Sequence, residues 1–485
     1  MTRFKLRKMR SSVGMLCLAL LGYSNAIADV TLPDCFSDHM VLQQGMPVHI
    51  YGSAEPGECV RVRFQGQSKS CKADSQGSWS VLLDPLAMLP SKNSETMVVE
   101  GNNRLQLTDI LVGEVWLGSG QSNMGLPTAA PDFREDVRMS KRVIDGPYSN
   151  IRILCSGGTW KLSSPNELEA FSALMFSFGY ALQTELNVPV GLIVGAVGGT
   201  PSGRWVTAGM INEYLPELEL AGKKVDNGKF EIGDLYHKHI APFAGYTIRG
   251  VLWDQGESGV RISELSQVEA MGALIHGWRK AWQSPELPFL YMQKGSGMGC
   301  ALNPENLDNQ FARLFEPLDA SAQVMINGRS IEAYIRIREF ENTYLIQTQD
   351  LGAGTHPVNK TAYGTRAANT ALARVYGRPV PDIGPTYAGH EIKDGKVVIH
   401  FKNTGGGLVV GHSDLLQGFV VRPKQGRPEW AQATISGDTI VVSSDKVPNP
   451  AVVYYAWHPV SNWANLFGKN GLPAVPFHTE LNPVE

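Results

Sequence analysis

The chain has 485 residues, 51 of them glycine, and a formal net charge of −3. This length exceeds that of one ordinary domain and predicts roughly three folding units. Acidic and basic residues are mixed along the chain, without a basic stripe or an acidic tail. This charge pattern excludes a protein built to bind nucleic acid through a basic surface. The many glycines favour loop-rich β structure over a helical bundle.

The first residues have the pattern of a secretory signal peptide. A basic region over residues 3–10 precedes an apolar run over residues 13–22 and the small-residue cleavage site Ala26-Ile27-Ala28. A membrane anchor is the alternative, but the run is well short of the roughly 20 residues that span a bilayer. No later segment is long and apolar enough to cross a membrane. We therefore expect residues 1–28 to be removed and the mature protein to be exported, periplasmic or secreted.

Six cysteines are present, and one of them, Cys17, lies inside the signal peptide. Cys59 and Cys71 flank a predicted hairpin, so they are the best candidates for a disulfide in an oxidising compartment. The odd number that remains leaves at least one thiol free or paired between chains. The spacing of the cysteines and the lack of an attached His pair predict no zinc or other metal site.

Residues 29–110 predict an N-terminal β-sandwich with a structural role. Strand-like runs lie at 48–52, 59–64 and 78–83, separated by turn-forming clusters at 55–57 and 74–77. Short β runs return after a linker over 379–385, at 396–401, 418–421, 439–442 and 451–455. Residues 378–485 therefore predict a second, C-terminal β-sandwich.

Between them, residues 111–377 alternate apolar strand-like runs with helical patterns. The expected strands are 110–117, 190–196, 248–253, 289–293 and 344–348, and the expected helices include 173–185, 267–282 and 361–376. Strand–helix alternation of this kind is typical of a mostly parallel sheet with helices on both faces. We therefore expect an α/β domain here.

The first expected strand of this domain runs into Gly118-Ser119-Gly120-Gln121-Ser122-Asn123-Met124. Glycines before a serine allow a sharp turn and a close backbone approach to a ligand. Ser122 would then stand at a strand-to-helix turn, where a hydroxyl and the next backbone N–H groups face one point, as attack on a carbonyl requires. An ordinary glycine-rich turn is the alternative.

Three further unusual loops follow strands of the same expected sheet, and the carboxyl ends of parallel strands share one edge. The loop over 198–205 contains Gly199, whose backbone N–H could face a developing oxyanion. The loop over 253–259 contains Gln255, a possible amide donor, and Glu257, a possible acceptor. The loop over 350–360 contains His356, which could take the serine proton and return it to a leaving alcohol. Flexible turns, solvated side chains and a structural histidine are the alternatives.

The chain contains no Gly-x-Ser-x-Gly elbow, because Met124 stands two residues after Ser122. This argues against the α/β-hydrolase arrangement. A serine early and a histidine late in one α/β domain point to another family of serine hydrolases.

Together these segments resemble the sialate O-acetylesterase family, within the SGNH (flavodoxin-like) hydrolases. The matching stretches are 113–116, 120–124, 189–193, 198–200, 249–250, 253–258, 356–360 and 364–366, with flanks at 36–43 and 471–477. The resemblance implies a flavodoxin-like three-layer α/β/α domain, flanked by β-sandwiches, that needs no metal or organic cofactor. It implies removal of acetyl groups from sialic acid hydroxyls.

By position, the resemblance implies that Ser122 is the nucleophile and His356 the general base and acid. The backbone N–H groups of Ser122 and Gly199 and the Gln255 side chain would form the oxyanion hole, and Glu257 would be a supporting acceptor. An acetyl group would pass to Ser122 and then to water.

The sequence departs from the family pattern in front of the histidine. Relatives commonly have an aspartate two or three residues earlier, where this chain has Gly354 and Ala353. Asp350 is the nearest carboxylate and the candidate to orient His356, with a backbone carbonyl as the alternative. The residues around the Gln-Gly-Glu core, Asp254 and Gly259, also differ and could alter the pocket.

Arginines near the loops are candidates for substrate binding. Arg204, with its neighbour Trp205, and Arg366 could meet a sialate carboxylate, because the guanidinium fork binds both oxygens. Surface salt bridges are the alternative. The functional alternatives are an acetylesterase acting on other glycans, such as acetylated xylan, and a catalytically weakened glycan-binding protein. The missing aspartate keeps the second alternative open.

Overall fold

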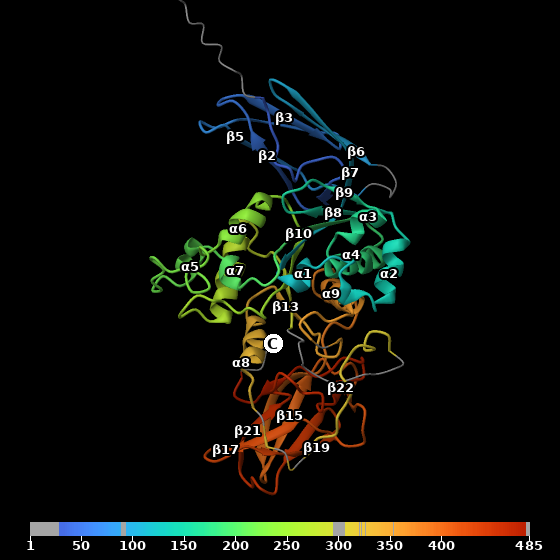
Figure 1. Cartoon of the computed structure of the whole chain (residues 1–485), viewed down its shortest axis with the longest axis vertical. Helices are drawn as coiled ribbons and strands as arrows, with labels where there is room; N and C mark the ends of the chain where they lie inside the picture. Colours follow the sequence, from blue (N-terminus) through green and yellow to red (C-terminus); the bar gives the residue numbers. More distant parts are fainter. Residues whose placement is uncertain are drawn as a thin grey trace, which may run out of the picture.

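The computed structural model describes residues 29–88, 94–293, 306–319, 321, 323–324, 326–352 and 354–481. The predicted signal peptide, residues 1–28, lies outside this part of the chain. An N-terminal β region, a central α/β region and a C-terminal β region follow one another along the long axis of the molecule (Figure 1).

Alternating burial explains the strands of the N-terminal β region. In β3 (Cys59–Phe64) every second residue is buried and its neighbours are exposed, as expected for a sheet with one face on a core. β3 pairs with β4 and β6, and β2 pairs with β5. The strands are β1 (Val41–Gln43), β2 (Val48–Ser53), β3, β4 (Gln67–Lys72), β5 (Ser78–Leu83) and β6 (Glu95–Glu100).

The strand register explains why the expected disulfide does not form. Cys59 is paired with Lys72, whereas Cys71 is paired with Val60. Directly paired residues share a face and successive residues alternate, so the two thiols lie on opposite faces of the sheet. Both cysteines are free in the structure, and this pairing was wrong.

One long strand, β7 (Arg104–Gly120), belongs to two sheets. Its first part pairs with β6 of the N-terminal region, and its last part lies between β10 and β11 of the central sheet. Residues from Ile110 onward are buried without alternation, as expected for a strand covered on both faces. The predicted domain boundary at residue 110 falls inside this strand.

The central sheet has the strand order β13-β12-β11-β7-β10-β8-β9. All neighbours are parallel except β9. Since β7 lies between β10 and β11, the order of the chain reverses at β7, and ligands bind at such switch points in open α/β sheets. The strands are β8 (Tyr148–Cys155), β9 (Lys161–Ser163), β10 (Val190–Ala196), β11 (Gly250–Asp254), β12 (Phe289–Met292) and β13 (Thr343–Ile346).

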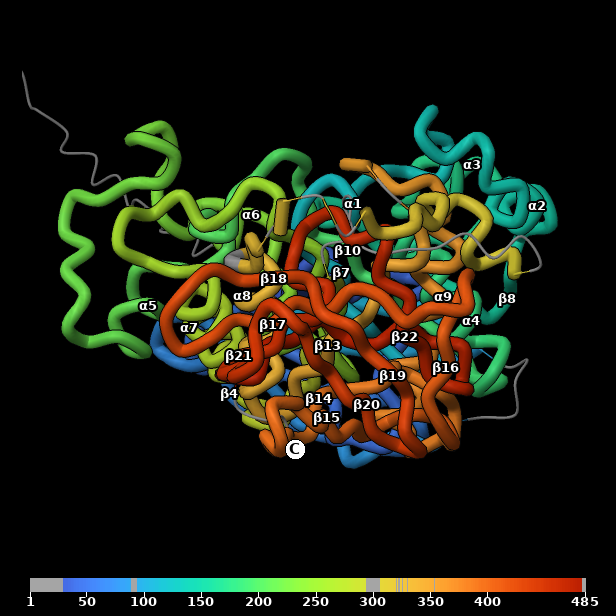
Figure 2. Tube along the Cα trace, turned by 90° about the horizontal axis from the view of Figure 1, so that it is seen from below, coloured from blue at the N-terminus to red at the C-terminus, as the bar shows by residue number. Residues whose placement is uncertain are grey.

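Helices cover both faces of this sheet (Figures 1 and 2). Trp116 of β7 packs in the core that includes α4 (Ala173–Leu186) and α9 (Lys360–Arg374). The next residue, Leu117, packs in the core on the other face, with α7 (Gln267–Ala281). In the part of the chain described, no helix combines the length and apolar character needed to span a bilayer. The remaining helices are α1 (Ser122–Gly125), η1 (Pro131–Phe133), α2 (Val137–Ile144), α3 (Pro165–Glu169), η2 (Ser202–Arg204), α5 (Ala208–Tyr214), α6 (Asp234–His239), η3 (Ala241–Phe243) and α8 (Arg329–Ile337).

The C-terminal β region contains two four-stranded sheets, β14-β15-β20-β19 and β18-β17-β21-β23, and the pair β16-β22. Two buried glutamines after β13 attach it to the central region: Gln347 and Gln349 donate to the carbonyl oxygens of Pro473 (2.9 Å) and Ala474 (2.8 Å). The strands are β14 (Thr386–Lys393), β15 (Lys396–Lys402), β16 (Leu408–Val410), β17 (Phe419–Pro423), β18 (Glu429–Trp430), β19 (Gln432–Ser436), β20 (Thr439–Ser443), β21 (Pro450–Tyr455), β22 (Leu466–Gly468) and β23 (Phe477–His478).

Candidate active site

A tight turn after β7 presents Ser122 at the carboxyl edge of the sheet. Gly120 has a φ of +129°, and a Cβ there would lie 2.0 Å from the carbonyl oxygen of Asp254, so only glycine fits. This close approach allows the N–H of Gln121 to donate to the same carbonyl at 2.9 Å. Ser122 then begins the short helix α1 with its side chain half-buried.

His356 lies in the loop between β13 and α9. Its Nε2 is 3.0 Å from the Oγ of Ser122, although 234 residues separate the two in the sequence. The structure therefore brings the predicted nucleophile and the predicted base within hydrogen-bonding distance. This is the geometry that proton transfer from the hydroxyl to the imidazole requires.

The carboxylate beside the histidine belongs to Asp132 in η1. Its Oδ1 is 3.2 Å from Nδ1 of His356. A carboxylate only accepts hydrogen bonds, so Nδ1 carries the proton of the neutral ring and Nε2 is left to accept from Ser122. Sequence reasoning missed Asp132, because it lies 224 residues from His356 and in none of the recognised motifs.

Asp350, the expected partner of His356, forms a buried ion pair with Arg366 instead. Arg366 donates to the two carboxylate oxygens at 3.2 and 3.1 Å, and Asn309 donates to the carboxylate at 2.9 Å. The side chains of Asp350 and Arg366 are only 2% and 8% exposed. The structure thus corrects two expectations: the carboxylate of Asp350 is paired with Arg366 rather than with the histidine, and the Arg366 guanidinium is buried in this internal ion pair rather than free for a substrate carboxylate.

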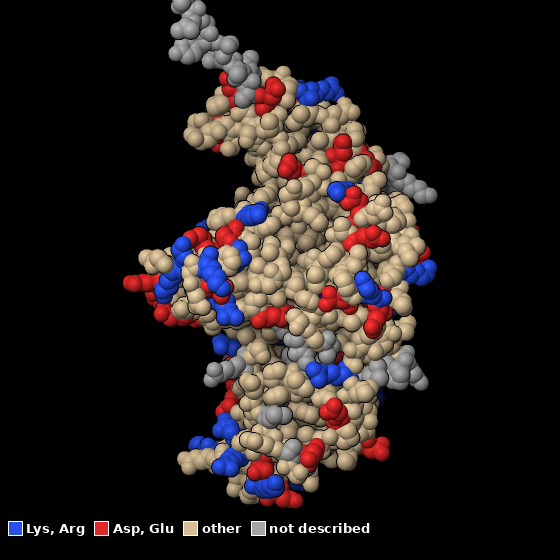
Figure 3. Space-filling model, in the orientation of Figure 1, with Lys and Arg blue, Asp and Glu red and all other residues tan. Residues whose placement is uncertain are grey.

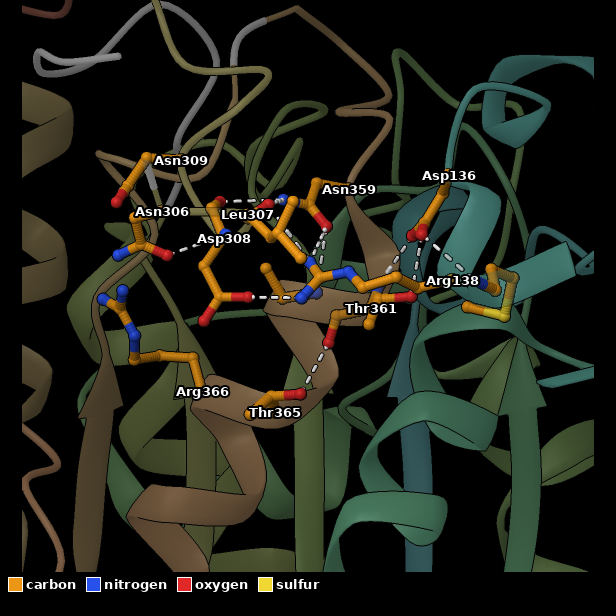
Figure 4. Close-up of polar contacts among 12 residues, drawn as sticks. Asp136, Arg138, Asn306, Leu307, Asp308, Asn309, Asn359, Thr361, Thr365 and Arg366 are labelled. Atoms are coloured by element: carbon orange, nitrogen blue, oxygen red, sulfur yellow. Dashed lines mark hydrogen bonds and ion pairs between the residues drawn. The ribbon is translucent and has the colours of Figure 1, made fainter. Parts of the chain in front are cut away.

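A polar network holds the start of α9, and with it the histidine loop, onto α2 and the segment 306–309 (Figure 4). Asn359 donates to the carbonyl oxygen of Asp308 at 2.7 Å. Arg138 donates to the Asn359 side chain at 3.0 Å and to the Asp308 carboxylate at 2.7 Å. Asp136 accepts from the N–H of Thr361 at 2.8 Å. These contacts hold the loop that carries His356 in a defined position, although none of them involves Ser122.

The loop after β10 passes beside the nucleophile. A Cβ on Gly198 would lie 3.5 Å from the Cβ of Ser122, whereas Gly199 has a φ of +69° and a Cβ there would meet no atom within 4 Å. The loop that carries Gly199 therefore runs next to Ser122, and the backbone N–H of Gly199 stays a predicted oxyanion donor.

The side chain of Gln255, expected to donate to an oxyanion, donates to two backbone carbonyl groups instead. Its amide nitrogen donates to the carbonyl oxygens of Thr200 (3.3 Å) and Gly259 (3.2 Å), and its side chain is buried. Both amide hydrogens are thus used to join two loops rather than to form an oxyanion hole. Trp205, expected near substrate, is 0% exposed, and its indole N–H donates to the hydroxyl of Thr200 at 3.0 Å.

Arg204 is also committed within the protein. Its Nε lies 2.9 and 3.2 Å from the two carboxylate oxygens of Asp234, and its guanidinium stacks over the ring of Phe230 at 3.7 Å. The side chain is 13% exposed. The guanidinium of Arg204 therefore forms an ion pair inside the protein and not the expected contact with a substrate carboxylate.

Glu257 contacts the residue that follows the nucleophile. Its Oε1 accepts from the Nδ2 of Asn123 at 2.9 Å, so it is placed as the supporting acceptor that was expected. Asn123 also accepts from the ammonium of Lys360 at 2.7 Å. Asn123 and Lys360 stand inside the recognised motifs, one residue after Ser122 and four residues after His356, but sequence reasoning gave them no role.

Serine, imidazole and carboxylate in hydrogen-bonded succession, at the switch point of a parallel sheet, are the arrangement of a serine hydrolase. Comparison with known proteins narrows the class. Residues 112–352 match the family described as "Carbohydrate esterase, sialic acid-specific acetylesterase". The chain is similar to this family over these residues, and the protein is a carboxylic ester hydrolase.

Individual relatives agree. The chain is 26% identical over 387 residues to the sialate O-acetylesterases of Pongo abelii and Homo sapiens, covering 70% of this chain and 70% of each relative. The crystal structure of a carbohydrate acetylesterase from Xanthomonas citri superposes with a TM-score of 0.75 at 26% identity, covering 93% of this chain and 99% of that chain. The similarity to the solved structure therefore extends over all three regions described above.

Proposed function

We propose that the protein is an exported serine esterase that removes O-acetyl groups from glycans, with sialic acids as the first substrate class. The observation that carries this proposal is the 3.0 Å separation between the Ser122 hydroxyl and the His356 imidazole. The family description and the names of the relatives support acetyl esters of sialic acid as substrate. Export rests on the signal-like pattern of residues 1–28.

The first half of the proposed reaction transfers the acetyl group to the enzyme. His356 Nε2 takes the proton of Ser122 as Oγ attacks the acetyl carbonyl carbon, and Asp132 stabilises the imidazolium that forms. The backbone N–H groups of Ser122 and Gly199 donate to the oxyanion. The tetrahedral intermediate collapses as the imidazolium returns its proton to the sugar oxygen, which leaves as an alcohol.

The second half regenerates the enzyme. Water attacks the acetyl-serine carbonyl carbon while His356 accepts one of its protons; the same proton then passes to Oγ of Ser122 as the C–Oγ bond breaks and acetic acid leaves, to ionise to acetate in solution. The order of the elements supports a flavodoxin-like SGNH arrangement for this domain. The serine follows the first strand of the parallel sheet, the histidine follows the last, and helices cover both faces.

Esterase action on neutral glycans, such as acetylated xylan, is the second candidate. The observation that favours it is that Arg204 and Arg366, the expected partners of a sialate carboxylate, are both paired with internal carboxylates. The face seen in Figure 3 carries Lys and Arg interspersed with Asp and Glu rather than one basic patch. A catalytically weakened glycan-binding protein is less well supported, because Asp132 supplies the carboxylate that is missing before His356.

Acetate release from O-acetylated sialic acid and from acetylated xylan separates the candidates. We expect the wild-type protein to release acetate from at least one of them and the Ser122→Ala variant to lose this activity. Faster release from the sialic acid supports the first candidate, and faster release from xylan supports the second. Equally slow release by the wild type and the variant on both substrates contradicts serine catalysis.

A further inference from the structure

We propose that Lys360 is a positioning residue for the reaction, which rests on the proposed function. Its ammonium sets the orientation of the Asn123 side chain, and that side chain fixes the spacing between the peptide segments that carry Ser122 and His356. Lys360 does not touch Ser122 or His356 through any contact described above, so it acts through its neighbour.

Lys360 is an unusual lysine because its side chain is completely buried. Lysine is almost never fully buried unless its charge is paired. Here Nζ donates to Oδ1 of Asn123 at 2.7 Å and lies over the rings of Phe133 (5.2 Å) and Tyr363 (4.8 Å). An amide oxygen and two aromatic faces therefore lie beside the cation, and aromatic faces attract a cation through the ring quadrupole.

The chemistry of the ammonium determines which way the amide of Asn123 points. An ammonium has three donors and no acceptor, so the Asn123 atom that faces it must be the oxygen. The amino group is therefore directed to the other side, where it donates to Oε1 of Glu257 and to the carbonyl oxygen of Thr355, both at 2.9 Å. Without the cation, the amide could rotate and lose both of these contacts.

The positions of these partners in the chain explain the consequence for the site. Asn123 directly follows Ser122, and Thr355 directly precedes His356, so this bond links the side chain of the residue after the nucleophile to the backbone of the residue before the base. Phe133, whose ring faces the cation, directly follows Asp132. The ammonium of Lys360 therefore contacts the neighbour of Ser122 and the neighbour of Asp132. Lys360 itself is the first residue of α9, four residues after His356.

Stability alone does not explain a charge at this position. Well-packed apolar residues often replace buried ionic groups with little loss of stability. A methionine would fill the space between the rings of Phe133 and Tyr363, but it could not hold the Asn123 oxygen. This difference makes Lys360→Met a test that separates positioning from packing.

The experiment compares Lys360→Met with wild-type protein and with a control, Lys141→Met. Lys141 is an exposed lysine of α2 that is paired with Asp145. Active sites are counted by stoichiometric labelling of Ser122 with an organophosphonate, and kcat and KM are measured with an acetyl ester. We expect a full complement of labelled sites, a KM within about threefold, and a kcat about 10- to 100-fold lower, the effect of a small misplacement of reacting groups. The control keeps the wild-type kcat.

A second variant, Asn123→Leu, tests the route of the effect. If Lys360 acts through Asn123, the double variant loses no more kcat than the more impaired single variant. Multiplicative losses would overturn the proposal, as would an unchanged kcat in Lys360→Met or a fall in labelled sites that matches the fall in rate. A wild-type protein without any acetylesterase activity would overturn the proposed function itself, and this result is distinct because it requires no variant.

Discussion

Asp132 and His356 meet across 224 residues of sequence, with Oδ1 of the aspartate 3.2 Å from Nδ1 of the histidine. The carboxylate comes from η1, which follows the serine loop, rather than from the segment just before the histidine. Both side chains are partly accessible, with exposed fractions of 40% for Asp132 and 28% for His356. The ion pair that would form during the reaction is therefore partly screened by solvent.

Asp132→Asn tests this contact. The amide can donate to Nδ1 and so stabilise the tautomer whose Nε2 carries the proton, which cannot accept from Ser122. We expect kcat with an acetyl ester to fall by between about 10- and 10⁴-fold, the upper figure being that for a buried triad aspartate, while the melting temperature stays within a few degrees. The matched control is Asp145→Asn, a carboxylate of similar exposure that pairs with Lys141 and not with His356. Equal activity of Asp132→Asn and wild type would contradict the assigned role.

Ser122→Ala, His356→Ala and the double variant test whether the two residues act as one unit. Residues of one catalytic group are strongly non-additive, so each single variant should lose nearly as much activity as the double variant, at least about 10³-fold. His356 is partly exposed, so we expect its variant to fold, as checked by circular dichroism and thermal melting. Multiplicative losses, or an unfolded His356→Ala, would argue for a structural histidine.

Breaking the buried ion pair between Asp350 and Arg366 should lower the free energy of unfolding rather than act directly on the reaction. Asp350→Ala leaves the guanidinium buried without its charged partner, which costs about 3–5 kcal/mol for a buried pair. We expect a lower urea midpoint, and the double variant Asp350→Leu/Arg366→Met should recover much of the loss because it removes both charges. If Asp350→Ala kept full stability and lost activity, the original expectation that Asp350 orients the histidine would regain support.

The cysteines give a chemical test of the fold. Burial raises the pKa of the Cys35 thiol to about 12. A raised pKa keeps the thiol protonated at pH 8, and only the thiolate reacts quickly, so native Cys35 should resist iodoacetamide. Exposed Cys59 should be alkylated under the same conditions, without prior reduction. Mass spectrometry of the peptides reads out both results, and a linked Cys59–Cys71 peptide would contradict the strand register described above.

Much of the α/β region follows from local sequence pattern. The run from Val190 to Ala196 was expected as a strand and is β10, because continuous apolar residues of this length suit a strand buried on both faces. Ser122 and His356 could be nominated because both follow strands of one parallel sheet, and the carboxyl ends of such strands share an edge. β8 was missed, since Ser149, Asn150 and Arg152 interrupt its apolar pattern.

Local pattern therefore determined which elements form and which loops could carry chemistry. The partners of individual charges depended on the tertiary structure alone. The packing of distant loops decides that Asp350 pairs with Arg366 and that Asp132 contacts His356. Polar contacts act over a few ångströms of space, so they do not depend on distance in the sequence. The same reason separates Cys59 from Cys71, because a single step along a strand moves a side chain to the opposite face of the sheet.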